Sequence, residues 1–324
     1  MKIAFFDTKS YDKSSFEKAG KDNGIDFKFF ETKLNEDTVK LASGFDGVCI
    51  FVNDTANKTV IDALYDYGVK IIILRCAGFN NVDMNAANNK IAVVRVPAYS
   101  PYAVAEHTMA LILTSVRRIH KAFVRTKSFN FSLSDLTGFD LYGKTVGVIG
   151  TGKIGKIFIN ICKGFGMNVL AFDKFPDKTA DLKYVDLEEL FEKSDIISLH
   201  CPLTDETYHI IDKNSINKMK RGVLIVNTSR GALIDADALL DGIKSRKIGG
   251  ACLDVYEEES DFFFEDYSSH IVEDDVLARL ISMPNVLVTS HQAFLTEEAL
   301  ANIAQTSIEN ILEFFATGKC KNSV

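Results

Sequence analysis

Gly150, Gly152 and Gly155 form a spaced glycine motif at the end of an apolar run that begins at Thr145. An amphipathic helical pattern from 156 to 165 follows directly. A strand, a tight turn and a helix in this order create a phosphate site, because the free N–H groups at the helix N-terminus point toward the anion. The first glycine permits the turn, the second lets the backbone approach a pyrophosphate, and the third lets the helix pack on the strand. The motif therefore predicts a dinucleotide-binding site.

Asp173 ends the next predicted strand and refines this prediction. A carboxylate at that position accepts the ribose hydroxyls of NAD and repels the 2′-phosphate of NADP. A glycine motif alone is weak evidence, since an ordinary glycine-rich turn in an α/β protein can match it. The strand, the helix and the aspartate together favour NAD as the cofactor.

Arg230 is the candidate for binding an acidic substrate. Reduction of a carbonyl by a nicotinamide also requires a fixed cation to hold such a substrate and a proton donor for the carbonyl oxygen. Arg230 follows the apolar run 223–228 and precedes Gly231. At the carboxyl end of a central strand, a guanidinium can bind a carboxylate through two parallel hydrogen bonds. A structural salt bridge to a neighbouring acid is the alternative.

His291 is the candidate proton donor, because it directly follows the predicted strand 286–290. A buried Glu259 beside it would fix the tautomer of the imidazole and raise its pKa, so that it stays protonated near neutral pH. Glu259 belongs to the acidic run 257–261, and a solvated loop is the alternative for that run. Position alone does not single out one histidine. The other five are expected to be structural or solvated: His107, His120, His200, His209 and His270.

The elements that must position these residues fall into two α/β series. Short runs rich in Ile, Val and Phe predict the strands, and helical patterns such as 58–67 separate them. The first series has predicted strands at 2–7, 27–31, 47–52, 70–76 and 92–96. The second has them at 145–150, 168–173, 195–200, 223–228, 250–255 and 286–290, which is the set that a dinucleotide-binding fold requires.

Two long helical patterns flank the second series. One runs from Tyr102 to about Lys127, and the other from Thr296, a plausible N-cap, to Ala316. Because the glycine motif lies in the middle of the chain, we expect a Rossmann NAD-binding domain, 101–294, inserted into a flavodoxin-like substrate domain, 1–100 and 295–324. Both would be doubly wound parallel sheets, with the two helices as crossings and a ligand cleft between the domains.

Composition narrows the classes of protein. The chain has 324 residues, enough for two domains, and a net charge of −7 without a basic cluster, which argues against a nucleic-acid partner. No apolar segment is long enough for a membrane span, and Asp7 interrupts the first apolar run too early for a signal peptide. The scattered cysteines lack a CxxC pair, which is typical of reduced thiols rather than of a zinc site. We therefore expect a cytoplasmic protein that needs no metal.

With these residues assembled, the sequence resembles the D-isomer-specific 2-hydroxyacid dehydrogenases, and most closely the fermentative NAD-dependent D-lactate dehydrogenases. The resemblance covers nearly the whole chain. Besides the glycine motif, its most specific segments are 74–83, 96–107, 198–204, 226–235, 254–259 and 290–294.

The resemblance implies a role for each matching residue. It implies that Arg230 binds the substrate carboxylate, that His291 is the acid/base and that Glu259 is the partner of His291. Formate-oxidising relatives carry Gln in place of this Glu, which disfavours formate as the substrate. The implied substrate contacts are Cys76, Ala77, Gly78, Tyr99 and Phe294, together with Arg230. The implied cofactor contacts, besides the three glycines and Arg230, are Lys153, Ile154, Asp173, Cys201, Pro202, Thr207, Thr228, Ser229 and Asp254.

The expected reaction is the reduction of pyruvate to D-lactate with NADH. A reductase of larger 2-oxo acids, glyoxylate or hydroxypyruvate is the first alternative, and a non-catalytic NAD(H)-sensing protein is the second. The resemblance implies a dimer or tetramer, and the long helix from Tyr102 is apolar enough to form an interface. Lys174 could weaken the rejection of NADP. The roles of Tyr102 and 262–264 stay open.

Overall fold

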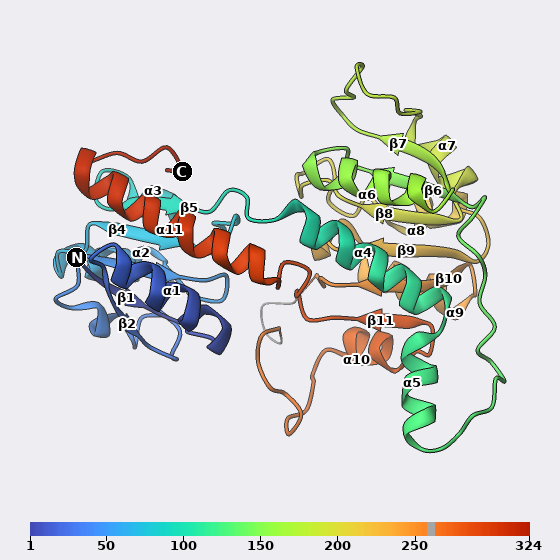
Figure 1. The fold of residues 1–324 in the computed structure, drawn as a ribbon, viewed down its shortest axis with the longest axis horizontal. Helices are drawn as coiled ribbons and strands as arrows, with labels where there is room; N and C mark the ends of the chain where they lie inside the picture. The colour runs from blue at the N-terminus through green and yellow to red at the C-terminus, as the bar shows by residue number, and fades with distance from the viewer. Residues whose placement is uncertain (258–262) are drawn as a thin grey trace. The chain divides into compact units, whose positions relative to one another are not determined.

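The computed structural model describes residues 1–257 and 263–324, and the chain forms two compact units (Figure 1). The first unit comprises residues 1–100 and 295–324, and the second comprises residues 101–294. Each contains a parallel sheet with helices packed against it. Every pairing between the named strands is parallel, as the alternation of strands and helices predicts.

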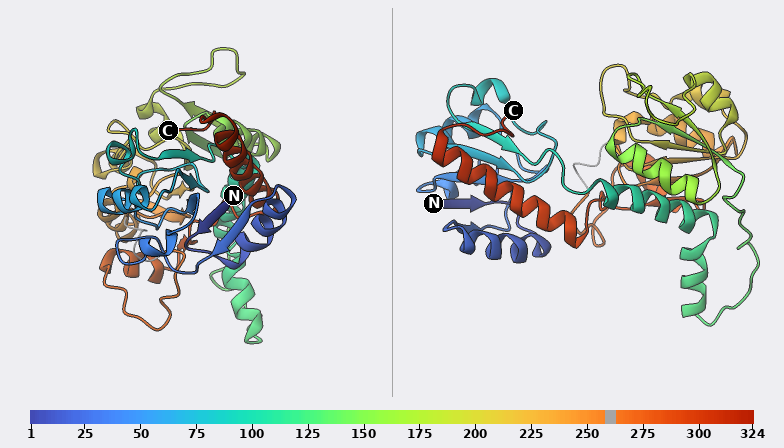
Figure 2. Two further views of the ribbon diagram at one scale, coloured as in Figure 1. Left: turned by 90° about the vertical axis from the view of Figure 1, so that its left-hand side faces the viewer. Right: turned by 45° about the horizontal axis from the view of Figure 1, so that its top comes forward.

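The sheet of the first unit has the strand order β2-β1-β3-β4-β5, the flavodoxin-like order. Its inner strands β3 and β4 are buried along their whole length, which explains why they read as continuous apolar runs. Helix α11 packs beside α1 (Figures 1 and 2). The strands are β1 (Lys2–Phe5), β2 (Asp26–Phe29), β3 (Gly47–Ile50), β4 (Ile71–Leu74) and β5 (Ala92–Arg95). The helices are α1 (Ser10–Asp22), η1 (Val39–Ala42), α2 (Lys58–Asp66), α3 (Met84–Ala87) and α11 (Glu297–Thr317).

The sheet of the second unit has the order β11-β10-β9-β8-β6-β7. Beyond the outer edge of β7, Tyr184 forms an isolated parallel bridge with Ala171 and occupies the place of a further short strand. With that position included, the order is that of a Rossmann fold, and the crossover between β6 and β8 is the point where such folds bind ligands. The strands are β6 (Thr145–Ile149), β7 (Asn168–Phe172), β8 (Ile196–Leu199), β9 (Val223–Asn227), β10 (Ile248–Leu253) and β11 (Val286–Val288). The helices are α4 (Pro101–Val116), α5 (Ile119–Lys127), α6 (Lys153–Gly164), α7 (Leu187–Lys193), α8 (Lys213–Lys218), η2 (Gly231–Leu233), α9 (Ala236–Lys244) and α10 (Asp275–Ser282).

Two apolar clusters cover the two faces of this second sheet. Val148 in β6 packs with helices α4 and α6, whereas its neighbour Ile149 packs with α7, α8, α9 and α10. Neighbouring residues of a strand point to opposite faces, so one strand contributes to both clusters. The glycine motif is therefore held at the end of a strand that is fixed on both sides.

The single long helix predicted from Tyr102 to Lys127 is wrong. Arg118 has a left-handed backbone, with φ of 54°, and it separates α4 from α5. The apolar spacing continues through the break, but α4 buries many side chains and α5 buries none. Helix α5 and the chain after it extend away from the sheet of the second unit (Figure 2). The pattern predicted helical residues correctly and missed the change of direction.

The other end of the inserted segment agrees with expectation. Thr296 accepts a hydrogen bond from the backbone N–H of Ala299 at 3.2 Å and caps α11, and Glu298 lies in its first turn.

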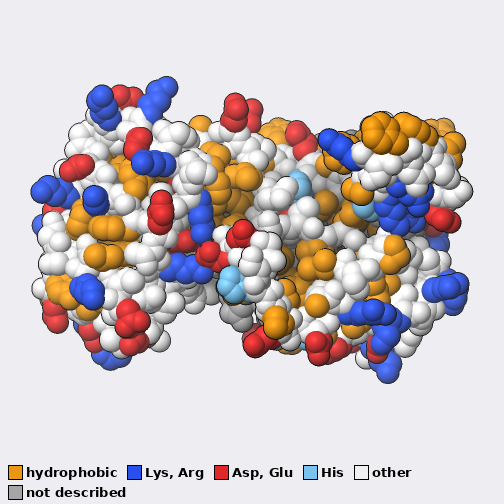
Figure 3. Space-filling view, turned by 90° about the horizontal axis from the view of Figure 1, so that it is seen from below, with side chains coloured by type: hydrophobic (Ala, Val, Ile, Leu, Met, Phe, Trp, Pro, Cys, Tyr) orange, Lys and Arg blue, Asp and Glu red, His pale blue; other side chains and the backbone are white. Residues whose placement is uncertain are grey.

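On the face drawn in Figure 3, acidic and basic side chains are interspersed. None of the helices in the described part of the chain has the length and apolar character that crossing a bilayer requires.

Candidate functional site

The glycine turn between β6 and α6 has the geometry that a pyrophosphate requires. Gly150 has φ of +99°, and a Cβ on it would lie 2.5 Å from the backbone nitrogen of Cys201. A Cβ on Gly155 would lie 2.0 Å from the carbonyl oxygen of Gly150. A Cβ on Gly152, by contrast, would meet nothing within 4 Å, so this residue faces open space. Gly152 also precedes α6 without a side chain to cap it, so the first N–H groups of the helix can face an anion.

His200 supports this turn from behind. Its backbone N–H donates to the carbonyl of Ile149 at 2.7 Å, and its Nε2 lies 2.9 Å from the Ser198 hydroxyl. The ring packs on Phe158 of α6, with ring centroids 4.9 Å apart. Burial lowers the pKa of His200 to about 3, so the imidazole is neutral at physiological pH. Its contacts make it a packing residue of the turn.

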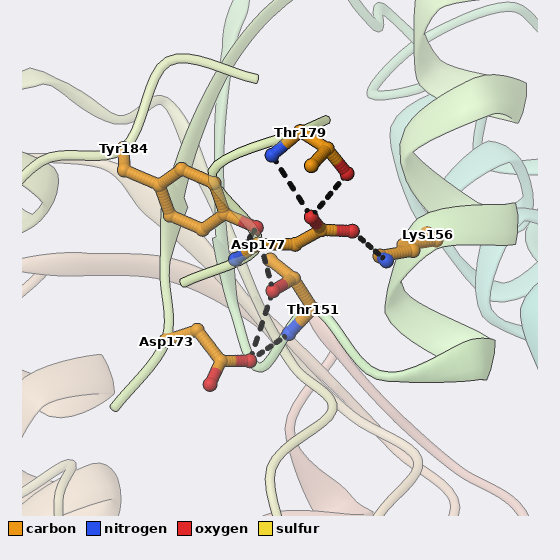
Figure 4. A network of polar contacts seen from close by, with 6 residues as sticks. All are labelled: Thr151, Lys156, Asp173, Asp177, Thr179 and Tyr184. Carbon is orange, nitrogen blue, oxygen red and sulfur yellow. Dashed lines mark hydrogen bonds and ion pairs between the residues drawn. The ribbon is translucent and has the colours of Figure 1, made fainter. Parts of the chain in front are cut away.

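Asp173 follows β7 and faces the turn (Figure 4). Its Oδ2 accepts the backbone N–H of Thr151 at 2.6 Å and the Thr151 hydroxyl at 2.9 Å, and its Oδ1 accepts the N–H of Phe175 at 2.9 Å. Burial raises the pKa of Asp173, but these hydrogen bonds outweigh burial and hold the pKa below its usual value. The carboxylate is therefore ionised beside the glycine motif.

Lys174, the residue after Asp173, forms an ion pair with a different carboxylate. Its ammonium forms an ion pair with Glu206 and lies 5.7 Å from the centre of the Phe175 ring. The positive charge that could have attracted a 2′-phosphate therefore has a carboxylate partner, although both side chains are exposed.

The loops after β8 and β9 come together at the same edge of the sheet. The Ser229 hydroxyl donates to the carbonyl of Cys201 at 2.8 Å, and the Thr207 hydroxyl donates to that of Pro202 at 2.7 Å. Thr228 is buried, with its hydroxyl 2.8 Å from that of Thr108 in α4. Most of the predicted cofactor contacts after β8 and β9 are thus brought together.

Arg230 is exposed at the end of β9. The side chain of Asn227 fixes the turn, since its Nδ2 donates to the carbonyl of Arg230 at 2.8 Å and its Oδ1 accepts the N–H of Ser229 at 3.0 Å. The Arg230 guanidinium donates to the Ser229 carbonyl at 2.7 Å. Within residues 1–257 and 263–324 it forms no ion pair with a carboxylate, so the salt-bridge alternative has no support there.

His291 lies in a strained turn after β11. Its φ is 52°, a left-handed conformation that residues with a side chain rarely adopt. Asp254, fully buried after β10, closes the turn: its carbonyl accepts the N–H of His291 at 2.7 Å, and its carboxylate accepts those of Gln292 at 3.0 Å and Ala293 at 2.8 Å. The Phe264 ring lies 5.8 Å from the imidazole, centre to centre.

Asp254 is a stronger anchor than the sequence suggested. Its carboxylate also accepts the Thr289 hydroxyl at 2.5 Å and lies 3.3 Å from Nε2 of His107 in α4. Burial raises the pKa of Asp254, but the hydrogen bonds from His107, Thr289 and Ala293 outweigh it and keep the pKa low. Its contact with the cofactor stays a prediction, whereas its support of the His291 turn is direct.

Glu259 and Phe262 lie outside the described residues, and the predicted pairing of Glu259 with His291 stays a prediction. Glu257, from the same acidic run, forms an ion pair with His209 at 2.6 Å. That part of the run is therefore not a freely solvated loop. Phe263 is buried in one of the two apolar clusters of the second unit.

The predicted substrate loop Cys76–Gly78 follows β4 in the first unit. Arg95 Nη1 donates to the carbonyl of Ala77 at 2.8 Å, and the backbone N–H of Val96 donates to that of Cys76 at 3.1 Å. The carbonyl of Tyr99 accepts a hydrogen bond from Asn302 of α11 at 2.7 Å. Phe294 is buried at the end of the second unit.

Sequence reasoning missed Thr151, Tyr184 and Asn227 as supporting residues, and it expected His107 to be structural or solvated without identifying its partner Asp254. Thr151 could have been found, because a hydroxyl inside the glycine motif must lie near the following carboxylate. Tyr184 gave no signal, since its position depends on how the segment between β7 and α7 returns to the sheet. No group of His, Cys, Asp or Glu side chains in the described ranges is arranged to hold a metal ion.

Comparison with known proteins shows the family to which the chain belongs. The family model for the NAD binding domain of D-isomer specific 2-hydroxyacid dehydrogenases matches residues 109–293. The chain belongs to this family and is an NAD-dependent 2-hydroxyacid dehydrogenase. The resemblance seen in the sequence and the prediction of NAD as the cofactor are confirmed.

Several individual proteins and solved structures are similar to the chain over its full length. The chain is 54% identical to a 2-hydroxyacid dehydrogenase homolog of Haemophilus influenzae, over 100% of this chain and 99% of that protein. It is 52% identical to the D-lactate dehydrogenase of Escherichia coli, over 100% of both. The apo-structure of D-lactate dehydrogenase from Escherichia coli matches with a TM-score of 0.92 and 50% identity over all of both chains. A structure titled as the pyruvate reductase of Chlamydomonas reinhardtii matches with a TM-score of 0.95 and 44% identity, over 99% of this chain and 98% of that one. The predicted fold class is confirmed.

Proposed function

We propose that this chain reduces pyruvate to D-lactate with NADH. The observation that carries the proposal is that an exposed Arg230 guanidinium and the constrained His291 turn lie at the same edge of one sheet. They follow β9 and β11, which flank β10 in one parallel sheet, so both lie at the carboxyl edge of that sheet. Further support comes from the relatives, a D-lactate dehydrogenase and a pyruvate reductase among them.

Each proposed role follows from the chemistry of the side chain. Arg230 holds the substrate carboxylate through two parallel hydrogen bonds, and the proton on His291 passes to the ketone oxygen. Glu259 is the proposed partner of that imidazole, and Phe294 is the proposed wall of the substrate pocket. When NADH is bound, its nicotinamide supplies the hydride. The backbone of Cys76, Ala77 and Gly78 and the side chain of Tyr99 complete the proposed substrate contacts.

The proposed cofactor contacts divide by the part of the dinucleotide they meet. The N–H groups at the start of α6 bind the pyrophosphate, and Asp173 accepts a ribose hydroxyl. The remaining proposed contacts follow β8, β9 and β10 at the same edge of the sheet. The full set is Gly150, Gly152, Lys153, Ile154, Gly155, Asp173, Cys201, Pro202, Thr207, Thr228, Ser229, Arg230 and Asp254.

A panel of oxo acids tests the proposed substrate. NADH consumption is measured with pyruvate, phenylpyruvate, hydroxypyruvate and glyoxylate, and kcat/KM is compared among them. We expect pyruvate to give the highest value. A higher value for another oxo acid would replace pyruvate as the substrate, and NADH binding without any turnover would favour the NAD(H)-sensing alternative.

We also propose a cytoplasmic homo-oligomer, a dimer or a tetramer. Helix α5 buries none of its side chains, and the segment after it exposes Phe129, Phe131, Leu133 and Tyr142, each by more than two thirds of its surface. Several exposed apolar side chains along one segment favour contact with another protein surface. The cysteines are free and buried, which fits a reducing compartment.

A further inference from the structure

The hydroxyl groups around Asp173 form a hydrogen-bond chain with one direction. An ionised carboxylate only accepts hydrogen bonds, so the Thr151 hydroxyl must donate its proton to Asp173. The Thr151 oxygen, 3.0 Å from the Tyr184 hydroxyl, must then accept the proton of Tyr184. The Tyr184 oxygen in turn accepts the backbone N–H of Asp177 at 3.3 Å. Figure 4 shows Thr151 between the carboxylate and the tyrosine.

This chain leaves the carboxylate little freedom. A carboxylate has about four lone-pair sites. Two sites on Oδ2 are taken by Thr151 and one on Oδ1 by Phe175. The remaining site on Oδ1 can accept one ribose hydroxyl, and the carboxylate cannot turn away without breaking several hydrogen bonds at once. A 2′-phosphate at that place would meet a fixed negative charge.

Tyr184 is itself held from two sides. Its backbone pairs with β7 through Ala171, whose N–H donates to Lys183 and whose carbonyl accepts the N–H of Val185, both at 2.9 Å. On the other side, Asp177 forms an ion pair at 2.6 Å with Lys156 of α6, the helix that begins at the glycine turn (Figure 4). The tyrosine hydroxyl is therefore fixed relative to both the carboxylate and the glycine motif.

We propose that Thr151 and Tyr184 are positioning residues that set the preference for NADH over NADPH by fixing the Asp173 carboxylate. The inference rests on the proposed contact between Asp173 and the adenosine ribose. Without the Tyr184 hydroxyl, the Thr151 oxygen loses the hydrogen bond that holds it beside the carboxylate, so Asp173 can rotate or take up a proton more easily. The carboxylate then accommodates the 2′-phosphate of NADPH at a smaller penalty.

Binding calorimetry on the full chain tests the proposal without any oxo acid. The dissociation constants of NADH and NADPH are measured for the wild type and for Tyr184→Phe, Thr151→Val and Thr151→Ser. One hydrogen bond corresponds to about a two- to tenfold change in affinity. We expect Tyr184→Phe to reduce the preference for NADH by this factor, Thr151→Val to reduce it further, and Thr151→Ser, which keeps the hydroxyl, to match the wild type. In the double variant, Tyr184→Phe should add little to Thr151→Val, because the chain is already broken.

A second measurement separates positioning from general stabilisation. Carboxyl carbon NMR of the cofactor-free protein reports the pKa of Asp173, which should rise in Tyr184→Phe and stay low in Thr151→Ser. An unchanged NADH preference in Tyr184→Phe, or an equal loss of affinity for both cofactors, would overturn the proposal. Equal affinity of the wild type for both cofactors would refute the contact of Asp173 and this inference with it. Normal NADH preference without pyruvate turnover would instead refute only the proposed reaction.

Discussion

At the scale of single residues, the proposed chemistry depends on side chains that the backbone presents under constraint. His291 has a left-handed backbone, and the buried Asp254 holds the turn through hydrogen bonds to three successive N–H groups. Such outliers persist only where the surroundings hold them, and they cluster at functional sites. Arg230, in contrast, is exposed at the end of β9, where we propose that it binds the substrate carboxylate.

Replacing the imidazole tests the role of His291. Asn tolerates a positive φ better than most residues, so His291→Asn should keep the turn and remove the proton donor. We expect kcat to fall by about a hundredfold or more. Steady-state kinetics with pyruvate and NADH measure this, and a kcat close to that of the wild type would remove His291 from the mechanism.

Arg230→Lys tests the anchor for the carboxylate. A lysine keeps the charge but cannot form two parallel hydrogen bonds, so the KM for pyruvate should rise by about ten- to a hundredfold. Arg221→Lys is the matched control, because Arg221 is exposed just before the start of the same strand. Equal KM values for the two variants would show that Arg230 does not bind the substrate.

At the scale of elements, the glycine turn connects β6 to α6 and packs against the chain after β8, and its three glycines have different roles. A methyl group on Gly155 would collide with the carbonyl of Gly150, whereas one on Gly152 would enter open space. His200 packs behind the turn as a neutral side chain. Stability and cofactor binding can therefore be separated by substitution.

Gly152→Ala and Gly155→Ala make this separation measurable. Gly155→Ala should lower the free energy of unfolding by about 1–3 kcal/mol, because the backbone must move to admit the methyl group. Gly152→Ala should unfold like the wild type but bind NADH about five- to a hundredfold more weakly, since the methyl group enters the space proposed for the pyrophosphate. Thermal unfolding and calorimetry test both; normal NADH affinity in Gly152→Ala would place the pyrophosphate elsewhere.

The pH dependence of unfolding tests the buried histidine. The pKa of His200 is about 3 in the folded chain and about 6.5 when the imidazole is exposed, so the unfolded chain binds a proton first as the pH falls. His200 therefore favours the folded state fully above pH 6.5, and this stability is lost between pH 6.5 and pH 3 by at most about 1.4 kcal/mol per pH unit. Denaturant unfolding should show a weaker loss in His200→Gln, which cannot take up the proton. An identical pH profile in the two proteins would mean that His200 is protonated in the folded state as easily as in the unfolded one.

The sequence predicted the positions of the strands correctly, but it did not predict the break between α4 and α5 or the roles of residues in loops. Each predicted strand corresponds to one of β1–β11, because buried parallel strands give short continuous apolar runs that are easy to recognise. The break at Arg118 was missed because apolar spacing continues across it, although the side chains of α5 are exposed. The positions of Arg230, His291 and Asp173 after strands could be predicted from the apolar runs that precede them, and their roles stay predictions. Tyr184 and Asn227 could not, because their roles depend on how loops fold back.

At the scale of the whole molecule, an inserted Rossmann unit supplies both the cofactor motif and the candidate acid and anchor. Its α5 and the segment after it carry apolar side chains that no part of the described chain buries. We therefore propose that the oligomer interface, which the sequence analysis placed on the long helix, lies on residues 119–142, called here the projecting segment.

A change of the projecting segment tests oligomer formation. We expect the double variant Phe131→Ser/Leu133→Ser to shift the protein toward the 36.0 kDa monomer, because it removes apolar area from the proposed interface. Ile271→Ser is the control, since Ile271 is similarly exposed outside this segment. Analytical ultracentrifugation distinguishes the species; an unchanged oligomer in the double variant would place the interface elsewhere, and a monomeric wild type would refute the oligomer itself.

The stereochemistry of the product tests the central claim most directly. Pyruvate and NADH are converted by the wild-type chain, and the lactate formed is resolved by chiral chromatography. The proposed function predicts D-lactate alone. L-lactate, a racemic product or the absence of lactate would contradict it.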